Sequence, residues 1–256
     1  LSIQLNLPIN ISWVDEGQHN PPMNLLSSKI NGFCSSIYED SLKSIFSTIE
    51  KLESTIIIYS PQYKYLFEIL ESNIVNNYAV ELNSSAFQEF ASTTLGVDES
   101  KNRFKKISNL NPNQNLKFLP RSRSDFTNII MMVNPESYKA LVPALRYHGE
   151  NKYIYLNFIS SLEDLNSPLQ LLDYEDTLIQ LSTTALGSIR DKNLSSLEGF
   201  LERSILRDWL LIEVLKQAGV QSASINGMTG KLFFNAGRCT KRDIPMHKMR
   251  AELLST

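Results

Sequence analysis

The most constraining feature of the sequence is an apolar run that leads directly into a helix pattern. Residues 129–133 read IIMMV, without the alternation of a strand that has one solvated face. A continuous run of this kind is typical of a strand buried on both faces, as in a parallel sheet between two layers of helices. We therefore predict a strand over 127–133 inside an α/β sheet.

A helix is expected immediately after this strand. Asn134 can cap its first turn and Pro135 suits its first position. Apolar residues then recur at the spacing of one helix face, at Tyr138, Leu141, Val142 and Leu145. We expect Gly149 to end this helix. Because Pro143 lacks a backbone donor, we also expect it to kink the helix or divide it in two.

Strand and helix signals alternate along much of the chain. Strands are predicted at 9–14, 55–59, 78–82, 116–119 and 153–158, and helix patterns lie at 42–49, 65–70 and 201–212. Strands that alternate with helical patterns of roughly 10–15 residues indicate β-α-β units and hence an α/β fold.

The flanks of this alternating region do not supply a complete second sheet. Residues 38–158 contain enough units for one three-layer lobe, whereas 1–37 supply about one strand and 159–222 no clear strand. Either the missing strands lie outside this chain, as we expect, or some strands cannot be recognised from sequence. A run at 231–235 between two glycine turns predicts half of a hairpin or an added edge strand.

Composition and cysteine usage are ordinary for a globular protein. The 256 residues are 42% hydrophobic with a formal charge of −2, enough for one large or two small domains. No run approaches the roughly 20 apolar residues that cross a bilayer. The opening LSIQLNLPIN lacks the regions of a signal peptide, so any targeting segment is expected outside this chain. For Cys34 and Cys239 we expect two semi-buried thiols rather than a disulfide.

Charge is segregated along the chain. Seven basic residues and no acidic one lie between Lys101 and Arg123, whereas 161–202 carry eight acidic residues against two basic ones. Solvated surface is the favoured interpretation of each run, and contact with an anionic partner is the alternative. A nucleic-acid partner is not expected, because the pI is about 6.0 and no basic-aromatic motif or zinc finger occurs.

Three charged residues precede the predicted buried strand at alternate positions. Arg121, Arg123 and Asp125 would project to the same side if this stretch is extended. They are candidate contacts for a partner or a ligand. The alternative is an ion pair between Asp125 and one arginine that only orders the loop.

No catalytic, cofactor or metal site is predicted. His19, His148 and His247 are scattered and none is at ligand spacing from another. The sequence has no nucleophile elbow, Walker A loop or dinucleotide fingerprint, and no serine is followed three residues later by lysine. The GMTG segment at 227–230 could cradle an anion, but a turn that enters a strand is the favoured interpretation.

Three segments, in order, resemble the C-terminal domain of the penicillin-binding-protein activator lipoproteins, the LppC-like family. They are LGVDESKNRFKKI, PRSRSDFTNIIMMVNPESYKALVPALRYHG and INGMTGKLFFNAGRCTKRDIP. They match an L-G-[ILV]-x-x-S-x-x-R helix, a P-R-x-R-x-D element, a P-x-L-x-[FY] motif in a helix, with Tyr147 as the last motif residue, and a late G-x-T-G-x-L turn. Each motif alone is weak, but the four occur in the family order and span most of the chain.

The resemblance implies a fold like the type I periplasmic-binding proteins, with two lobes of mainly parallel sheets sandwiched by helices. On that mapping, 1–37 and 159–222 belong to a first lobe that is truncated here. Residues 38–158 form the second lobe, and 223–256 return to it with a late strand and a C-terminal tail. The stretch 162–187 matches no recognised element of the family.

The resemblance also implies a function. The family acts in the periplasm as outer-membrane lipoproteins that stimulate a bifunctional peptidoglycan synthase, a penicillin-binding protein, and are not enzymes. We expect a non-catalytic regulator without a cofactor, attached to the membrane only through a lipid anchor outside this chain. Candidate partner or ligand contacts are Arg121, Arg123, Asp125 and Tyr147. The alternative is a receptor for an amino acid, peptide or cell-wall fragment in the cleft between lobes; a hydrolase or transferase is the third hypothesis.

Overall fold

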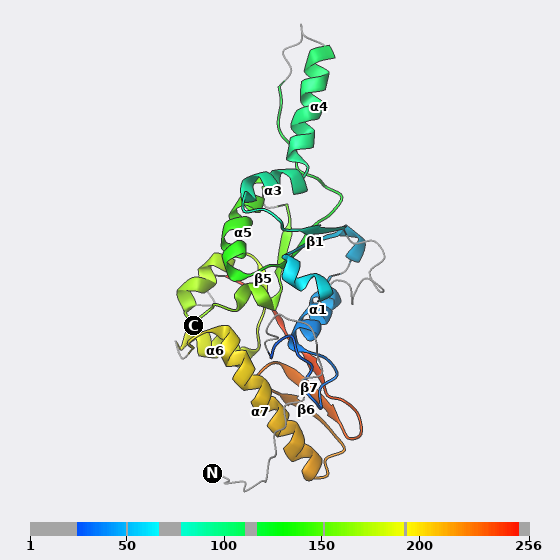
Figure 1. The fold of residues 1–256 in the computed structure, drawn as a ribbon, viewed down its shortest axis with the longest axis vertical. Coiled ribbons are helices and arrows are strands. Elements are labelled where there is room, and N and C mark those ends of the chain that lie inside the picture. Colours follow the sequence, from blue (N-terminus) through cyan, green and yellow to red (C-terminus); the bar gives the residue numbers. More distant parts are fainter. Residues whose placement is uncertain are drawn as a thin grey trace.

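A mostly parallel six-stranded sheet forms the centre of the molecule (Figure 1). The computed structural model describes residues 25–49, 51–66, 78–110, 117–150, 152–191 and 194–250. In spatial order the strands are β2 (Tyr78–Glu81), β1 (Thr55–Tyr59), β3 (Asn128–Met132), β4 (Ile154–Asn157), β5 (Leu178–Gln180) and β9 (Met246–Lys248). The first five are parallel, and β9 is antiparallel at the edge.

The apolar run at 129–133 lies at the heart of this sheet, as predicted. Strand β3 pairs with β1 on one side and β4 on the other, with Ile130 opposite Ile57 and Leu156. Its residues from Ile129 to Val133 are at most 1% exposed. A strand paired on both edges and covered on both faces needs apolar side chains at every position, which explains the absence of alternation.

The described residues form six α-helices. They are α1 (Ile37–Thr48), α3 (Phe87–Thr94), α4 (Val97–Leu110), α5 (Pro135–Gly149), α6 (Thr183–Arg190) and α7 (Leu197–Gln217), with short 3-10 turns at Leu52–Ser54, Pro61–Tyr63, Ile159–Leu162 and Pro168–Tyr174. Helices α3 and α5 pack together on one side of the sheet and α1 lies on the other (Figure 1). Helix α3 lies between β2 and β3 and α5 between β3 and β4, and right-handed crossovers in the same direction place both on one face. The predicted α/β fold is confirmed.

Helix α5 begins as predicted but does not break. The side chain of Asn134 accepts a hydrogen bond from the Ser137 backbone at 2.8 Å, and Pro135 occupies the first turn. The helix continues through Pro143 to Gly149, so the expected division is wrong. Pro143 faces solvent while its neighbours Val142 and Ala144 are buried, and this packing holds the helix on the sheet.

Helix α5 ends at Gly149, as expected, but this glycine is not the left-handed residue. The left-handed residue after the helix is Glu150, with φ of 49°. Gly149 is the last helical residue, and a Cβ at this position would lie 2.8 Å from the ring of Tyr153. The glycine therefore admits the tyrosine ring and does not supply the left-handed turn.

A smaller antiparallel sheet packs against the longest helix. Its order is β6 (Ser222–Asn226), β7 (Lys231–Asn235) and β8 (Lys241–Asp243). Buried Leu232 and Phe234 alternate with exposed positions on β7, and they form a cluster with Ile212 of α7 and with Phe33. The prediction of a hairpin at 231–235 is confirmed, but β7 is the middle strand and not an edge strand.

One predicted strand is wrong, one strand was missed, and one prediction falls outside the described residues. The predicted strand at 116–119 is wrong for its described part, because 117–119 run beside α4 and pair with no sheet. The region 159–222 does contain a strand, β5, which is only three residues long and therefore gives no readable pattern. The strand predicted at 9–14 lies outside the described residues.

The order in which the chain contributes strands to the two sheets differs from the expected mapping, in which 159–222 belong to the first lobe and 223–256 to the second. Strand β5, from the stretch 159–222, joins the large sheet, whereas 223–243 form strands of the small one. The small sheet is also antiparallel, unlike the second parallel sheet that we expected. Edge strand β9 returns the chain to the large sheet beside β5.

Cys34 and Cys239 form a disulfide, so the expectation of two thiols is wrong. A parallel bridge between Phe33 and Thr240 brings the cysteines together, with backbone hydrogen bonds from Cys34 to Thr240 at 2.9 Å and from Thr240 to Gly32 at 2.7 Å. The two cysteines are 205 residues apart in the chain. Only tertiary pairing could make them neighbours.

Candidate interaction site

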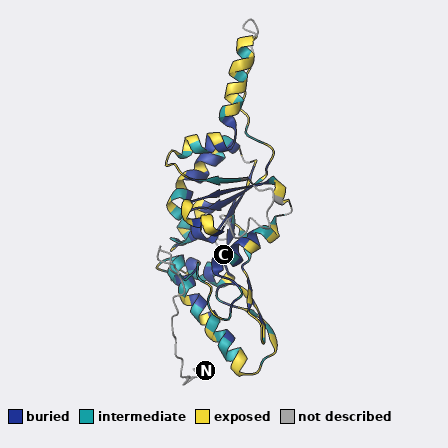
Figure 2. Cartoon of the chain, turned by 45° about the vertical axis from the view of Figure 1, so that its right-hand side comes forward, coloured by how far each residue is buried: buried dark blue, intermediate teal, exposed yellow. Residues whose placement is uncertain are grey.

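Helix α4 projects away from the body of the molecule. Figure 1 shows it extending from α3 at one end of the long axis, and Figure 2 shows a mostly exposed surface. The segment 117–125 runs back beside it towards β3, and Phe104 stacks on Phe118 with ring centroids 4.3 Å apart. We call α4 and the segment 117–125 the arm.

The base of the arm is built from two of the segments that carry the family resemblance. Gly96, with φ of 68°, turns the chain from α3 into α4, and its backbone lies against Arg123, whose Cγ would be 2.8 Å from a Cβ at this position. The backbone of Arg123 donates to Leu95 at 2.8 Å, and that of Arg121 to the Ser100 hydroxyl at 3.2 Å. These contacts fix the direction in which the arm leaves the body.

Arg123 and Asp125 form the ion pair that was the alternative to a ligand site. The Arg123 guanidinium donates from Nε to Asp125 at 2.9 Å and from Nη2 to its second oxygen. These hydrogen bonds hold the pKa of Asp125 below its usual range. The guanidinium also lies 5.4 Å from the centre of the Phe126 ring. Arg123 therefore has a structural role at the base of the arm.

The other two predicted residues are exposed. Arg121 is exposed beside α4, and the side chain of Tyr147 on α5 is 76% exposed, with a ring contact to His148 at 5.0 Å. A partner could reach both residues. Their role as contacts stays a prediction.

The GMTG turn does hold an anion, which is the chain's own Asp208. The carboxylate of Asp208 on α7 accepts from the backbones of Met228 at 2.7 Å and Thr229 at 2.9 Å, and from the Thr229 hydroxyl at 2.6 Å. A Cβ at Gly227 would lie 2.9 Å from this carboxylate. Asp208 is 1% exposed, so the turn is occupied internally and locks the small sheet to α7.

Aromatic side chains fill the space at the carboxyl ends of the central strands. In open α/β sheets, ligands bind outside these ends where the strand order reverses, which here is between β1 and β3. Tyr38, Tyr63 and Phe158 pack edge to face at centroid distances of 5.2 to 6.0 Å, and each is at most 5% exposed. The described residues therefore leave little room for a ligand at this point.

Glu163 lies beside this aromatic group. It accepts a hydrogen bond from the Tyr38 hydroxyl, and its backbone oxygen accepts from the Glu198 backbone at 3.1 Å. Burial raises the pKa of Glu163 to about 7, and the nearby negative charges of Glu198, Asp164 and Glu202 act in the same direction.

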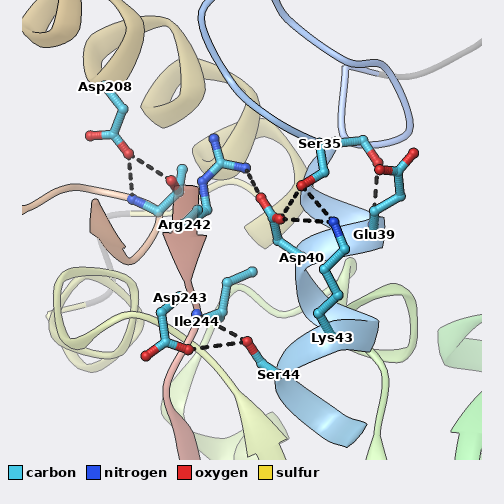
Figure 3. A network of polar contacts seen from close by, with 11 residues as sticks. Ser35, Glu39, Asp40, Lys43, Ser44, Asp208, Arg242, Asp243 and Ile244 are labelled. Carbon is cyan, nitrogen blue, oxygen red and sulfur yellow. Dashed lines mark hydrogen bonds and ion pairs between the residues drawn. The ribbon is translucent and has the colours of Figure 1, made fainter. Parts of the chain in front are cut away.

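A buried ion pair joins the small sheet to α1 (Figure 3). Arg242 of β8 contacts Asp40 at 3.2 Å, and the two side chains are 2% and 5% exposed. Ser35 donates to the other oxygen of Asp40, and the Arg242 guanidinium lies 4.3 Å from the Phe33 ring centre. Burial raises the pKa of Asp40 and lowers that of Arg242, while their mutual attraction opposes both shifts. An adjacent hollow, lined in part by Arg242 and Ile205, is too tight for a water molecule.

An open cavity lies elsewhere, between α5 and the turn at 168–174. Its volume is about 270 Å³, and it is lined by Tyr138, Lys139, Val142, Pro143, Arg146, Leu172 and Asp173. Lys139 is paired with Asp164 at 2.5 Å, and Arg146 donates to the backbone oxygen of Glu175. The cavity therefore combines an apolar floor with charges of both signs.

The described residues contain neither a metal-binding cluster nor a membrane-spanning helix. No group of three or more histidine, cysteine, aspartate or glutamate side chains in this part of the chain is placed to hold a metal ion. No described helix has the length and apolar character that crossing a membrane requires.

Comparisons with known proteins give only distant structural similarity. No protein-family model and no curated protein sequence matches this chain. Among solved structures, it is similar to a solute-binding protein of an ABC transporter from Rhodopseudomonas palustris HaA2, crystallised in complex with p-hydroxybenzoic acid. The sequence identity is 9% and the TM-score 0.39, over 85% of this chain and 67% of the other.

Sequence reasoning missed several residues that organise these sites. Asp208 and Asp40 are acids in helices, and no local pattern marks an acid that will be buried by a distant strand. The projection of α4 was also missed. A signal was available, because 97–110 is helical in propensity but has only Val97, Phe104, Ile107 and Leu110 as apolar residues, too few to cover a core.

Proposed function

We propose that this chain is a non-catalytic binding domain that activates a bifunctional peptidoglycan synthase of the penicillin-binding-protein class. The arm is the observation that carries the proposal. Two segments that resemble the activator family, at 95–103 and 120–125, meet at the base of the arm and hold it away from the body. A rigid, exposed and charged projection is suited to protein contact and not to catalysis.

The disulfide supports a location outside the cytoplasm. Structural disulfides persist in oxidising compartments such as the bacterial periplasm and are rare where thiols are kept reduced. A Cys34–Cys239 bond therefore accords with action in the periplasm, where peptidoglycan synthases work. In this proposal, attachment to the outer membrane depends on an anchor outside this chain.

The test is a reconstituted reaction with the bifunctional synthase of the same organism. The full-length protein is titrated into assays of glycan polymerisation and peptide cross-linking, and its binding to the synthase is measured by interferometry. We expect saturable binding and a faster rate in at least one assay. An absence of both binding and stimulation would exclude this function.

The cavity beside α5 favours a second candidate, a receptor for a small zwitterion. The cavity has a volume of about 270 Å³ and an apolar floor. Lys139 and Arg146 supply positive charge around this floor, and Asp173 supplies negative charge. Such a mixed lining suits an amino acid or a short peptide. This cavity is not the cleft between lobes that the sequence led us to expect.

A thermal-shift screen with amino acids and D-alanyl-D-alanine distinguishes this candidate from the first. A ligand at about 100 times its Kd should stabilise the protein by about 2.7 kcal/mol. The shift should disappear in the Asp173→Asn variant, and the exposed Asp176→Asn serves as the matched control. If no ligand in the screen raises the thermal midpoint, the receptor hypothesis has no support.

A further inference from the structure

The arm carries a positive charge that the molecule itself does not neutralise. Lys101 lies 3.4 Å from Asp98, and Arg123 is paired with Asp125. Within the described part of the chain, Arg103, Lys105 and Lys106 have no acidic side chain at ion-pair distance. These exposed cations repel one another, and a negatively charged partner would relieve that repulsion.

One face of α4 combines two of these cations with apolar side chains. We call it the arm face, and its members are Arg103, Lys106, Ile107 and Leu110. Their spacing of 3, 4 and 7 residues places them on one side of the helix. Ile107 is 50% exposed and Leu110 is 79% exposed. Phe104 points in another direction, onto Phe118 of the return segment, so the arm face is not covered by the arm itself.

The arrangement of the cations indicates the shape of the partner. At about 100° per residue, the four basic positions of α4 spread over about 200° of the helix circumference. They are Lys101, Arg103, Lys105 and Lys106. A groove whose floor contacts Ile107 and Leu110 would have Arg103 and Lys106 against its walls. Lys101 and Lys105 lie on the opposite side of the helix, outside such a groove. Helices that dock in this way place residues at i, i+3, i+4 and i+7 on the floor of an apolar groove.

The arm is already ordered for such docking. Its helix is fixed at the base by Gly96 and Arg123, and the stacked ring of Phe118 supports it at Phe104. A preformed element binds without the entropy cost of folding on its partner.

We propose that the arm face inserts into an apolar groove with an acidic rim on the partner protein. The inference rests on the proposed function, because it takes that partner to be the synthase. Ile107 and Leu110 occupy the floor of the groove, while Arg103 and Lys106 contact its acidic rim.

The experiment compares the synthase affinity of the full-length protein with that of matched variants. In Arg103→Glu/Lys106→Glu, two exposed cations of the arm face change sign; Lys29→Glu/Lys64→Glu makes the same charge change at exposed positions elsewhere. Leu110→Ser removes a 79% exposed leucine, and Leu169→Ser removes a 73% exposed one away from the arm. Circular dichroism checks that every variant keeps the wild-type thermal midpoint, as surface substitutions should.

We expect both arm variants to raise the Kd about tenfold or more, while both controls stay within about twofold of wild type. Binding of the wild type should weaken with salt, and binding of the charge-reversed arm variant should lose most of that dependence. Wild-type affinity in both arm variants would overturn the inference and leave the proposed function intact.

Two further outcomes also count against the inference. If the wild type does not bind the synthase, both the inference and the proposed function fail. Sedimentation with phosphatidylglycerol vesicles tests a lipid surface: if the arm variants lose vesicle binding but keep synthase binding, the arm binds lipid and the groove is excluded.

Discussion

At the scale of single residues, Asp208 holds the glycine-bracketed turn at 227–230. Three donors from Met228 and Thr229 converge on its buried carboxylate. Local sequence does predict the turn, because glycines bracket it. The carboxylate comes from a helix about 20 residues earlier, and only packing of that helix on the small sheet brings it there.

Replacing this carboxylate should destabilise the protein. In Asp208→Asn, an amide group replaces one acceptor oxygen with a donor, so a buried N–H or hydroxyl loses its partner. We expect the free energy of unfolding to fall by about 2–4 kcal/mol in urea titrations. The exposed Asp173→Asn is the control, and a loss below about 0.5 kcal/mol would show that the turn does not depend on Asp208.

Glu163 should make stability depend on pH. Its pKa is about 7 in the folded protein against a usual 4.5. Between these values the folded protein keeps the proton and the unfolded chain has released it, so the free energy of unfolding falls as pH rises through this window. Above pH 7 the destabilisation is complete, and below pH 4.5 it is absent.

The variant Glu163→Gln should remove this dependence. We expect it to be more stable than the wild type by about 1–3 kcal/mol at pH 8 and within about 0.5 kcal/mol at pH 4. Urea titrations from pH 4 to pH 8 measure the difference, with the exposed Glu53→Gln as control. Parallel pH profiles of wild type and variant would contradict the assignment.

At the scale of elements, the sequence predicted those parts whose own residue types and spacing are distinctive. Strand β3, the cap of α5 and the β6–β7 hairpin belong to this group. Strand β5 was missed because three residues carry no period, and 117–119 were assigned to a strand because apolar residues beside α4 look like those of a sheet.

The Cys34–Cys239 disulfide links two distant segments and should raise the free energy of unfolding substantially. It closes a loop of 205 residues between the segment before α1 and the turn between β7 and β8. We expect Cys34→Ser/Cys239→Ser to lower the free energy of unfolding by about 2–5 kcal/mol. Reductant should lower the urea midpoint of the wild type and leave that of the variant unchanged. A wild type insensitive to reductant would argue against the bond.

At the scale of the whole molecule, the two sheets are held together by buried polar contacts. Arg242 and Asp40 form the central pair, and Ser44 accepts from the Ile244 backbone at 3.3 Å (Figure 3). Because a buried charge without its partner is costly, the junction couples the unfolding of the small sheet to that of the large one.

Breaking the pair on one side should therefore destabilise the entire protein. For Arg242→Met we expect a loss of about 3–5 kcal/mol, since Asp40 would stay buried and charged. The double variant Asp40→Asn/Arg242→Met should recover part of this loss. Hydrogen exchange of the β7 and β3 amides measures the opening of the small and the large sheet, respectively. If the small sheet of the wild type opens independently of the large one, the coupling is contradicted.

The sequence by itself determined the α/β class, the buried central strand with its helix, and the basic character of 101–123, because these depend on residue type and local spacing. The tertiary structure alone decided the Cys34–Cys239 bond, the Asp208 turn, the Asp40–Arg242 junction and the projection of α4. The first three of these join residues that are distant in the sequence, and the last depends on whether the helix packs against the body of the protein. Local patterns record how a segment can fold, whereas the packing of the whole chain decides what that segment contacts.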